Sequence, residues 1–444
     1  MGQKAQRVPE ASILTDQNPE SGLEISDLAP ENIPTSPDNW GMNPLLASLQ
    51  PYPFERLRQL FAGLTPPSAQ AHISLGIGEP KHATPEFIKT ALVSSLPTAL
   101  SGYPATAGEI RMREACSNWL LRRYNIQVNA VTQILPVNGS REALFSLTQA
   151  VLDPAKPGAR VISPNPFYQI YEGATLLGGA QPYYVGNEAE NDFTAEWDSV
   201  PDDIWQATQL VFVCSPGNPT GKVMPLAEWQ KLFELSEKYG FVIASDECYS
   251  EIYFRDEPPL GGLEAASLLG YKEFKRLIAF TSLSKRSNVP GLRSGFVAGD
   301  AAIIKDFLLY RTYHGCAMSG VVQAASIAAW NDEAHVIENR NLYRTKFSEV
   351  TPVLSEVMDV KLPDASFYLW AGVPSAWNNS DTDFARELFA AEHVTVLPGS
   401  FIARTAHGRN PGEGRVRMAL VAETAECLEA AHRIAHFIRK GRNS

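Results

Sequence analysis

Short apolar segments alternate with helical patterns along the middle of the chain, over residues 84–310. Each segment is bounded by polar, glycine or proline residues, as expected of strands buried on both faces of a sheet. The segments are residues 132–137, 160–163, 210–214, 241–245 and 277–282. This alternation predicts βαβ units, and therefore an α/β fold with a mainly parallel sheet flanked by helices on both faces.

The C-terminal third has a different pattern. Apolar positions at helical spacing over residues 319–357 predict one long helix or a broken pair. Beyond them come three strand-like segments, residues 367–370, 394–399 and 415–420, and then a helix over residues 425–439. We therefore expect a large cofactor-binding domain, residues 84–318, and a smaller α+β domain, residues 43–83 and 319–444. The cleft between them is the expected substrate site.

The first 42 residues contain scattered prolines among acidic and small polar residues and lack apolar periodicity, which predicts a disordered N-terminal extension. They contain no apolar core of a signal peptide, and no apolar run in the chain approaches the length of a membrane span.

Composition narrows the function classes. The 444 residues are 44% hydrophobic and 20% charged, which is typical of a globular protein. A net charge of -11 without a long basic stretch argues against nucleic acid or an anionic membrane as a partner. The five scattered cysteines form no Cys-x-x-Cys pair, which indicates reduced thiols in the cytoplasm and no metal site.

The segment Ser282-Leu283-Ser284-Lys285 is followed by Arg293, eight residues after the lysine. A lysine amine can form an imine with an aldehyde, and hydroxyl groups with a guanidinium can hold a phosphate dianion. Pyridoxal phosphate carries both an aldehyde and a phosphate and is therefore the expected ligand. Taken alone, the segment favours a serine-rich turn with a surface lysine, but together with the rest of the sequence it favours the cofactor site.

Asp246 and Tyr249 follow the apolar residues 241–244. A carboxylate there lies at the carboxyl end of a buried strand, the ligand-binding edge of an open α/β sheet. Asp246 is the expected partner of the pyridine nitrogen, keeping it protonated so that the ring withdraws electrons. Tyr249 is expected to donate its hydroxyl to the ring oxygen. The alternative is a helix N-cap beside a packed tyrosine.

Two loops supply further candidates. Residues 215–221, Ser-Pro-Gly-Asn-Pro-Thr-Gly, predict a tight loop in which an X-Pro bond can be cis. Its Asn218 is expected to donate to the same ring oxygen, with an ordinary Asn-Pro turn as the alternative. Ser140 begins a helical pattern, and a helix N-terminus favours phosphate. A plain serine N-cap is the alternative there.

These four segments, in this order and spacing, resemble the class I/II aminotransferases, which are fold type I pyridoxal phosphate enzymes. The resemblance extends from about Asn43 to the C-terminus and implies the aspartate aminotransferase-like fold. It implies that Lys285 is the Schiff-base lysine and proton carrier, that Asp246 is the pyridinium partner, and that Asn218 and Tyr249 bind the ring oxygen. The other residues implied to contact the cofactor, mainly at its phosphate, are Ser140, Arg141, Ser282, Ser284 and Arg293.

The same resemblance assigns two aromatic residues. Tyr168 matches a tyrosine that stacks on the cofactor ring, in preference to Tyr171; two core aromatics under a loop are the alternative. Tyr103 matches a tyrosine that reaches across a dimer interface to the neighbour's phosphate. The implied active unit is a homodimer with shared active sites.

Substrate contacts are implied at Arg417, Gly78 and Asn218. Arg417 matches the arginine that clamps the α-carboxylate, although Arg415 lies on the same face of a predicted strand. Gly78 belongs to a segment similar to a loop that closes over the substrate, where glycine permits close backbone approach. A simple turn is the alternative for that loop.

Residues 310–319 and 51–57 closely resemble segments of the proteobacterial succinyldiaminopimelate aminotransferases. This implies amino transfer from N-succinyl-LL-2,6-diaminopimelate to 2-oxoglutarate, giving N-succinyl-2-amino-6-oxopimelate and glutamate, in lysine and diaminopimelate biosynthesis. Arg311 is then a candidate ligand of the distal carboxylate, or an exposed structural arginine.

Two alternative activities use the same lysine, aspartate and phosphate site. They are transamination of an acidic or aromatic amino acid, and a C–S lyase-type elimination. A cofactor-sensing domain of a transcription regulator is disfavoured, because the acidic, proline-rich start does not resemble a basic helix-turn-helix segment.

Overall fold

The computed structural model describes residues 41–441. The chain divides into two compact units, Met1–Leu46 and Ala47–Ser444. All elements discussed here belong to the second except the 3-10 helix η2, which begins at Pro44. The predicted disordered extension, residues 1–42, lies almost wholly outside the described residues.

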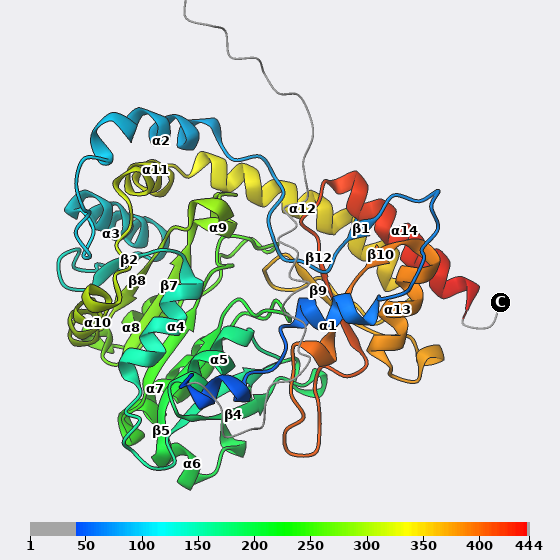
Figure 1. Cartoon of the computed structure of the whole chain (residues 1–444), viewed down its shortest axis with the longest axis horizontal. Helices are drawn as coiled ribbons and strands as arrows, with labels where there is room; N and C mark the ends of the chain where they lie inside the picture. The colour runs from blue at the N-terminus through cyan, green and yellow to red at the C-terminus, as the bar shows by residue number, and fades with distance from the viewer. Residues whose placement is uncertain (1–40, 442–444) are drawn as a thin grey trace, which may run out of the picture. The chain divides into compact units, whose positions relative to one another are not determined.

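A seven-stranded sheet with the order β2-β8-β7-β6-β5-β3-β4 forms the centre of the second unit (Figure 1). The strands from β7 to β4 are mutually parallel, whereas β8 is antiparallel to both of its neighbours. This confirms the mainly parallel sheet. The strands are β2 (Ile134–Val137), β3 (Arg160–Asn165), β4 (Gln181–Gly186), β5 (Thr208–Cys214), β6 (Val242–Asp246), β7 (Leu277–Ser282) and β8 (Gly295–Gly299).

Two of these strands, β4 and β8, were not predicted from the sequence. Strand β4 is an edge strand with only one fully buried residue, so it lacks an apolar run. Strand β8 begins and ends with glycine because its neighbour lies too close for a side chain. A Cβ on Gly295 would lie 2.3 Å from the Thr281 carbonyl oxygen, and one on Gly299 would lie 1.9 Å from that of Leu277.

Alternate residues of each central strand face opposite cores. Along β5, Val211 and Val213 pack into one apolar cluster, and Leu210 and Phe212 into another. The first cluster includes residues of α3, α7, α8 and α11, and the second includes residues of α4, α5 and α10. Helices therefore cover both faces, as predicted, and each fully buried aliphatic side chain contributes about 1.5–3 kcal/mol.

A smaller antiparallel sheet, β11-β12-β9, and a two-stranded parallel pair, β1-β10, lie against a separate apolar cluster. Helices α12 and α14 pack side by side there, in yellow and red in Figure 1. The strand predicted over residues 394–399 is split, because β10 pairs with β1 and β11 with β12. The strands are β1 (Ile73–Ser74), β9 (Tyr368–Gly372), β10 (Val394–Thr395), β11 (Leu397–Pro398) and β12 (Arg415–Ala419).

The predicted long helix over residues 319–357 is a broken pair, α11 and α12. The division into domains at residues 84 and 318 stays a prediction. The α-helices are α1 (Pro53–Leu60), α2 (Glu86–Ala99), α3 (Ile110–Tyr124), α4 (Ser140–Val151), α5 (Gln169–Leu177), α6 (Asp202–Ala207), α7 (Leu226–Tyr239), α8 (Gly262–Leu268), α9 (Leu283–Arg286), α10 (Ala301–His314), α11 (Gly320–Asn331), α12 (Ala334–Ser355), α13 (Asp381–Glu392) and α14 (Thr424–Lys440). The 3-10 helices are η2 (Pro44–Ser48), η3 (Ala189–Asn191), η4 (Trp197–Ser199), η5 (Lys272–Phe274), η6 (Pro290–Leu292), η7 (Ser375–Trp377) and η8 (Gly399–Phe401).

Within residues 41–441, none of the helices has the length and apolar character needed to span a membrane.

Candidate active site

A cavity of about 540 Å³ opens at the carboxyl ends of β5, β6 and β7 and is closed by residues of β9, β11 and β12. Sequence-predicted site residues line it together, which is the position expected for a ligand site in an open α/β sheet. They are Gly78, Ser140, Arg141, Tyr168, Asn218, Asp246, Tyr249, Ser282, Ser284, Lys285, Arg293 and Arg417. Tyr103 is the exception, because its side chain is fully exposed and does not line this cavity.

Lys285 extends into the cavity from the short helix α9, directly after β7. The Ser282 hydroxyl caps this helix by accepting a hydrogen bond from the Ser284 amide across 3.1 Å. Burial lowers the pKa of Lys285, and Arg293 lowers it further, while Cys248 and Asp246 oppose the shift. The amine is 3.5 Å from the Gly78 carbonyl oxygen. A lysine with a lowered pKa can attack an aldehyde as the neutral amine.

Asp246 ends β6 and is buried at the floor of the cavity. Its Oδ2 accepts a hydrogen bond from the Tyr171 hydroxyl across 2.8 Å. Burial raises the pKa of Asp246, and the bonds from Cys248 and Tyr171 oppose that shift. A buried carboxylate needs a positively charged partner, which a protonated pyridine nitrogen provides. The sequence interpretation weighed Tyr171 only for stacking on the cofactor ring and preferred Tyr168, so it did not predict this bond to Asp246.

Arg417 lies 4.4 Å above the ring of Tyr368 and donates from Nη1 to the Asn218 side-chain oxygen, across 3.0 Å. Its Nη2 donates to the Gly76 carbonyl oxygen across 2.9 Å, and its buried Nε has no partner within the described residues. A planar guanidinium with an unused buried N–H is suited to a carboxylate. Arg415 instead pairs with Asp359 at 3.1 Å and does not line the cavity. The geometry thus favours Arg417 over Arg415.

Hydroxyls, a guanidinium and a helix N-terminus meet at one end of the cavity. Ser140 is the first residue of α4, and its hydroxyl accepts a hydrogen bond from the Cys248 thiol across 3.0 Å. The Ser282 and Ser284 hydroxyls are 2.9 Å apart. Arg293 approaches so closely that a Cβ on Gly139 would lie 2.3 Å from its Nη2. This donor set fits a phosphate dianion at the positive end of α4.

Arg141 lies beside Tyr168 on another wall of the cavity. Its Nε donates to the Tyr168 hydroxyl across 2.7 Å, and its Nη2 donates to the Tyr52 hydroxyl across 3.4 Å. Tyr52 comes from the segment of residues 51–57 and was not among the predicted site residues. The contact shows that this N-terminal segment reaches the cavity wall.

The structure corrects the interpretation of Arg311. Arg311 is neither exposed nor a lining residue of the cavity: it is fully buried, pairs with Glu142 at 2.8 Å and donates to the Cys316 carbonyl oxygen. Its charge is therefore satisfied inside its own chain. Cys248 belongs to a buried apolar cluster and also lines the cavity beside Ser140, and burial raises the pKa of its thiol.

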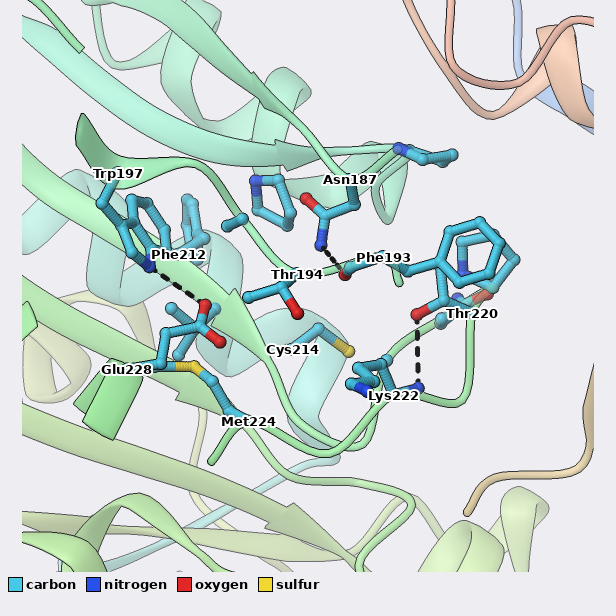
Figure 2. Close-up of a pocket in the computed structure, with 17 residues that line it drawn as sticks. Asn187, Phe193, Thr194, Trp197, Phe212, Cys214, Thr220, Lys222, Met224 and Glu228 are labelled. Carbon is cyan, nitrogen blue, oxygen red and sulfur yellow. Dashed lines mark hydrogen bonds between the residues drawn. The ribbon is translucent and has the colours of Figure 1, made fainter. Parts of the chain in front are cut away.

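A second cavity of about 40 Å³ lies beside the loop of residues 215–221 and shares Asn218 with the larger one. Figure 2 shows the Trp197 indole pointing at Glu228, to which it donates a hydrogen bond across 3.0 Å. Burial raises the pKa of Glu228 to about 7. Lys285, Asp246 and Arg293 all line the larger cavity, so we locate the chemistry there.

Comparison with known proteins agrees with this geometry. The family described as aminotransferase class I and II matches residues 71–434. An aminotransferase from Neisseria meningitidis is 56% identical, with a TM-score of 0.87 over 90% of this chain and 100% of that one. An LL-diaminopimelate aminotransferase from Nitratidesulfovibrio vulgaris is 32% identical over 88% of this chain and 97% of its own length.

A probable N-succinyldiaminopimelate aminotransferase from Thermus thermophilus is 23% identical, with a TM-score of 0.75 over 88% of this chain and 99% of that one. At that identity the likeness concerns the fold alone. The family match, the aspartate aminotransferase-like fold and the donor set of the cavity lead to one conclusion. The chain belongs to the class I and II aminotransferases and, as they do, depends on pyridoxal phosphate.

Proposed function

We propose that the enzyme transfers the amino group of N-succinyl-LL-2,6-diaminopimelate to 2-oxoglutarate. The observation that carries this proposal is the meeting of Arg141 and Tyr52 on the cavity wall. With Arg293 assigned to the phosphate and Arg417 to the α-carboxylate, Arg141 is a third guanidinium facing the cavity. Both substrates carry a carboxylate distant from the reacting carbon, and Arg141 can bind it. This revises the expected contact of Arg141 with the cofactor.

When bound, pyridoxal phosphate supplies an aldehyde for the amino group and a ring that withdraws electrons from the α-carbon. In our proposal the Lys285 amine holds the cofactor and then carries the α-proton, because its lowered pKa allows it to act as a base. Asp246 keeps the ring nitrogen protonated. Asn218 presents its NH2 group to the ring oxygen, since Arg417, which can only donate, occupies the amide oxygen.

LL-diaminopimelate itself is the second candidate, because the curated relatives at about 32% identity carry that name. Its distal end has an ammonium group, which the succinyl group blocks. Glu79 lines the same cavity and offers a carboxylate to such an ammonium. LL-diaminopimelate also carries a distal carboxylate for Arg141, so the two candidates differ in their dependence on Glu79.

The test is a panel of amino donors mixed with cofactor-loaded enzyme, followed by the absorbance of the cofactor. We expect N-succinyl-LL-2,6-diaminopimelate to give the highest kcat/KM. In Arg141→Met its KM should rise about 10–100-fold, as expected for one hydrogen bond to a charged group, whereas alanine as donor should be unaffected. Faster turnover of LL-diaminopimelate, lost in Glu79→Gln, would support the second candidate. Release of pyruvate from a β-substituted amino acid would instead support elimination.

We also propose a cytoplasmic homodimer. All five cysteines are free, as expected in a reducing compartment. Tyr103 and Tyr313 are both exposed, which is unusual for large aromatic side chains and suits a surface covered by a second copy.

A further inference from the structure

Tyr368, which was not predicted as a site residue, contacts three predicted site residues. It begins β9 and is 3% exposed. Its hydroxyl lies 3.1 Å from the Tyr249 hydroxyl, and its ring lies under the Arg417 guanidinium. A Cβ on Gly78 would lie 2.0 Å from its hydroxyl oxygen, so the glycine leaves the space that this hydroxyl occupies.

The direction of the hydrogen bond between the two tyrosines follows from the role proposed for Tyr249. A phenol has one proton, and Tyr249 is assigned to donate that proton to the cofactor ring oxygen. The bond between the two hydroxyls then requires Tyr368 to be the donor and the Tyr249 oxygen the acceptor. A hydroxyl that accepts a hydrogen bond becomes a stronger donor, because the two bonds polarise each other.

We propose that Tyr368 is a positioning residue with two functions: its hydroxyl strengthens the bond from Tyr249 to the cofactor ring oxygen, and its ring supports the Arg417 guanidinium that receives the substrate carboxylate. Arg417 also donates to the Gly76 carbonyl oxygen. The Tyr368 side chain thus connects the cofactor ring, through Tyr249, with the Arg417 guanidinium and the segment of residues 76–78. The inference rests on the roles assigned to Tyr249 and Arg417 but not on the identity of the amino donor.

The hydroxyl is tested without substrate, by titrating the absorbance of the bound cofactor with pH. Donors to the ring oxygen stabilise its negative charge and so favour loss of the proton from the nitrogen that joins Lys285 to the cofactor. Tyr368→Phe should therefore raise the midpoint by about 0.4–1 pH unit, the equivalent of one neutral hydrogen bond. Tyr249→Phe should raise it further. The double variant should match Tyr249→Phe alone, because the Tyr368 hydroxyl acts through Tyr249.

The other titratable groups near these atoms remain in every variant. Around the two hydroxyls they are Arg417, Cys214, Tyr52 and Asp246, and around the Lys285 amine they are Cys248, Arg293, Asp246 and Glu79. The matched control is Tyr343→Phe, a buried tyrosine of the same apolar cluster that does not line the cavity. It should leave the midpoint unchanged. An unchanged midpoint in Tyr368→Phe, or additive shifts in the double variant, would overturn the role of the hydroxyl.

The ring is tested separately with Tyr368→Leu. Loss of the aromatic face under Arg417 should raise the KM of both the amino acid and the oxo acid about 3–30-fold, the fold-change expected for a cation–π contact. Tyr368→Phe keeps the ring and should keep both KM values. Equal KM values in Tyr368→Leu and the wild type would reject the support of Arg417. Because every donor carries an α-carboxylate, this result does not depend on which donor the enzyme uses.

Discussion

The Arg417 guanidinium donates a hydrogen bond to the Asn218 side-chain oxygen across 3.0 Å. The bond joins the residue proposed to hold the substrate carboxylate to a residue proposed to hold the cofactor ring oxygen. It also fixes the orientation of the Asn218 amide, since only the oxygen can face a guanidinium. Substrate binding and cofactor orientation therefore share one contact.

Replacing Arg417 with lysine should raise the KM of amino and oxo acids about 10–100-fold, because an ammonium cannot form the two parallel hydrogen bonds of a guanidinium. Steady-state kinetics with both substrates measures this. Arg415→Lys is the matched control. Arg415 lies on the same strand as Arg417, but it pairs with Asp359 and does not line the cavity. Similar effects of the two substitutions would show that Arg417 is not the clamp.

Replacing Lys285 with alanine should abolish covalent attachment of the cofactor and turnover together. Lys285→Arg should not restore either, because a guanidinium stays protonated and cannot attack an aldehyde. Near-visible absorbance and the mass of the borohydride-reduced protein report the attachment. Full turnover in Lys285→Ala would mean that another residue holds the cofactor.

Asp246→Asn should separate binding from chemistry. The cofactor still binds, but exchange of the substrate α-proton slows by about two orders of magnitude or more, because the ring nitrogen loses its charged partner. Tyr171→Phe removes one hydrogen bond to the same carboxylate, so it should slow exchange by about tenfold. Proton exchange measured by NMR distinguishes the two variants. Wild-type exchange in Asp246→Asn would place the electron-withdrawing role elsewhere.

Lys346 is fully buried on α12, and its Nζ lies 2.9 Å from the His82 Nε2. Among residues 41–441 the structure describes no carboxylate in ion-pair contact with it. Burial lowers its pKa below the ordinary 10.5. Between the lowered value and 10.5 the unfolded chain binds more protons than the folded chain, so Lys346 makes the free energy of unfolding rise with pH in that window.

The measurement compares wild type with Lys346→Met by chemical denaturation at several pH values. We expect the free energy of unfolding of the wild type to increase relative to that of the variant as pH rises toward 10.5. The control is Lys305→Met, which removes a lysine from the exposed face of α10. A difference between the wild type and Lys346→Met that does not change with pH would contradict the lowered pKa of Lys346.

Hybrid dimers test whether Tyr103 acts across an interface. The activity of a Tyr103→Phe chain tested alone should fall about 10–100-fold, because one hydrogen bond to a charged phosphate is lost. Mixing it with the inactive Lys285→Ala chain should restore one good site per hybrid, in which the Lys285→Ala subunit supplies Tyr103. Activity equal to the average of the two parents, after confirmed subunit exchange, would reject shared sites.

The sequence predicted five of the seven strands of the large sheet and half of the residues that line the cavity, because strand ends and motif spacing are local properties. Asp246 directly follows one apolar segment and Lys285 comes three residues after another, and parallel pairing brings such positions to one edge. Tyr52 and Tyr368 were missed, and Tyr171 was set aside in favour of Tyr168, because each owes its position to contacts between segments far apart in the chain. An aromatic residue in an apolar run gives no sign of which hydroxyl it will face.

For Arg311 the sequence suggested a ligand-binding residue that the structure does not place in the cavity. Its motif resembled a subfamily segment, and the distal carboxylate of the implied substrates favoured a ligand-binding role, with an exposed structural arginine as the alternative. Its partner, Glu142, lies 169 residues earlier, so only the folded chain shows that the charge is neutralised. Motif spacing indicates which residues are grouped, whereas pairing over long range decides which of them remain available to a ligand.

The pairing of β1 with β10 has a consequence for synthesis of the chain. Ile73 and Ser74 lead into the segment of residues 76–78, and their strand partners are Val394 and Thr395. At about 5–20 residues per second, the ribosome reaches those partners roughly 16–64 seconds after it has made β1. During that interval the residues proposed to cover the substrate have no strand to hold them. A segment translated late in synthesis therefore completes the active site that β1, the first strand among residues 41–441, begins.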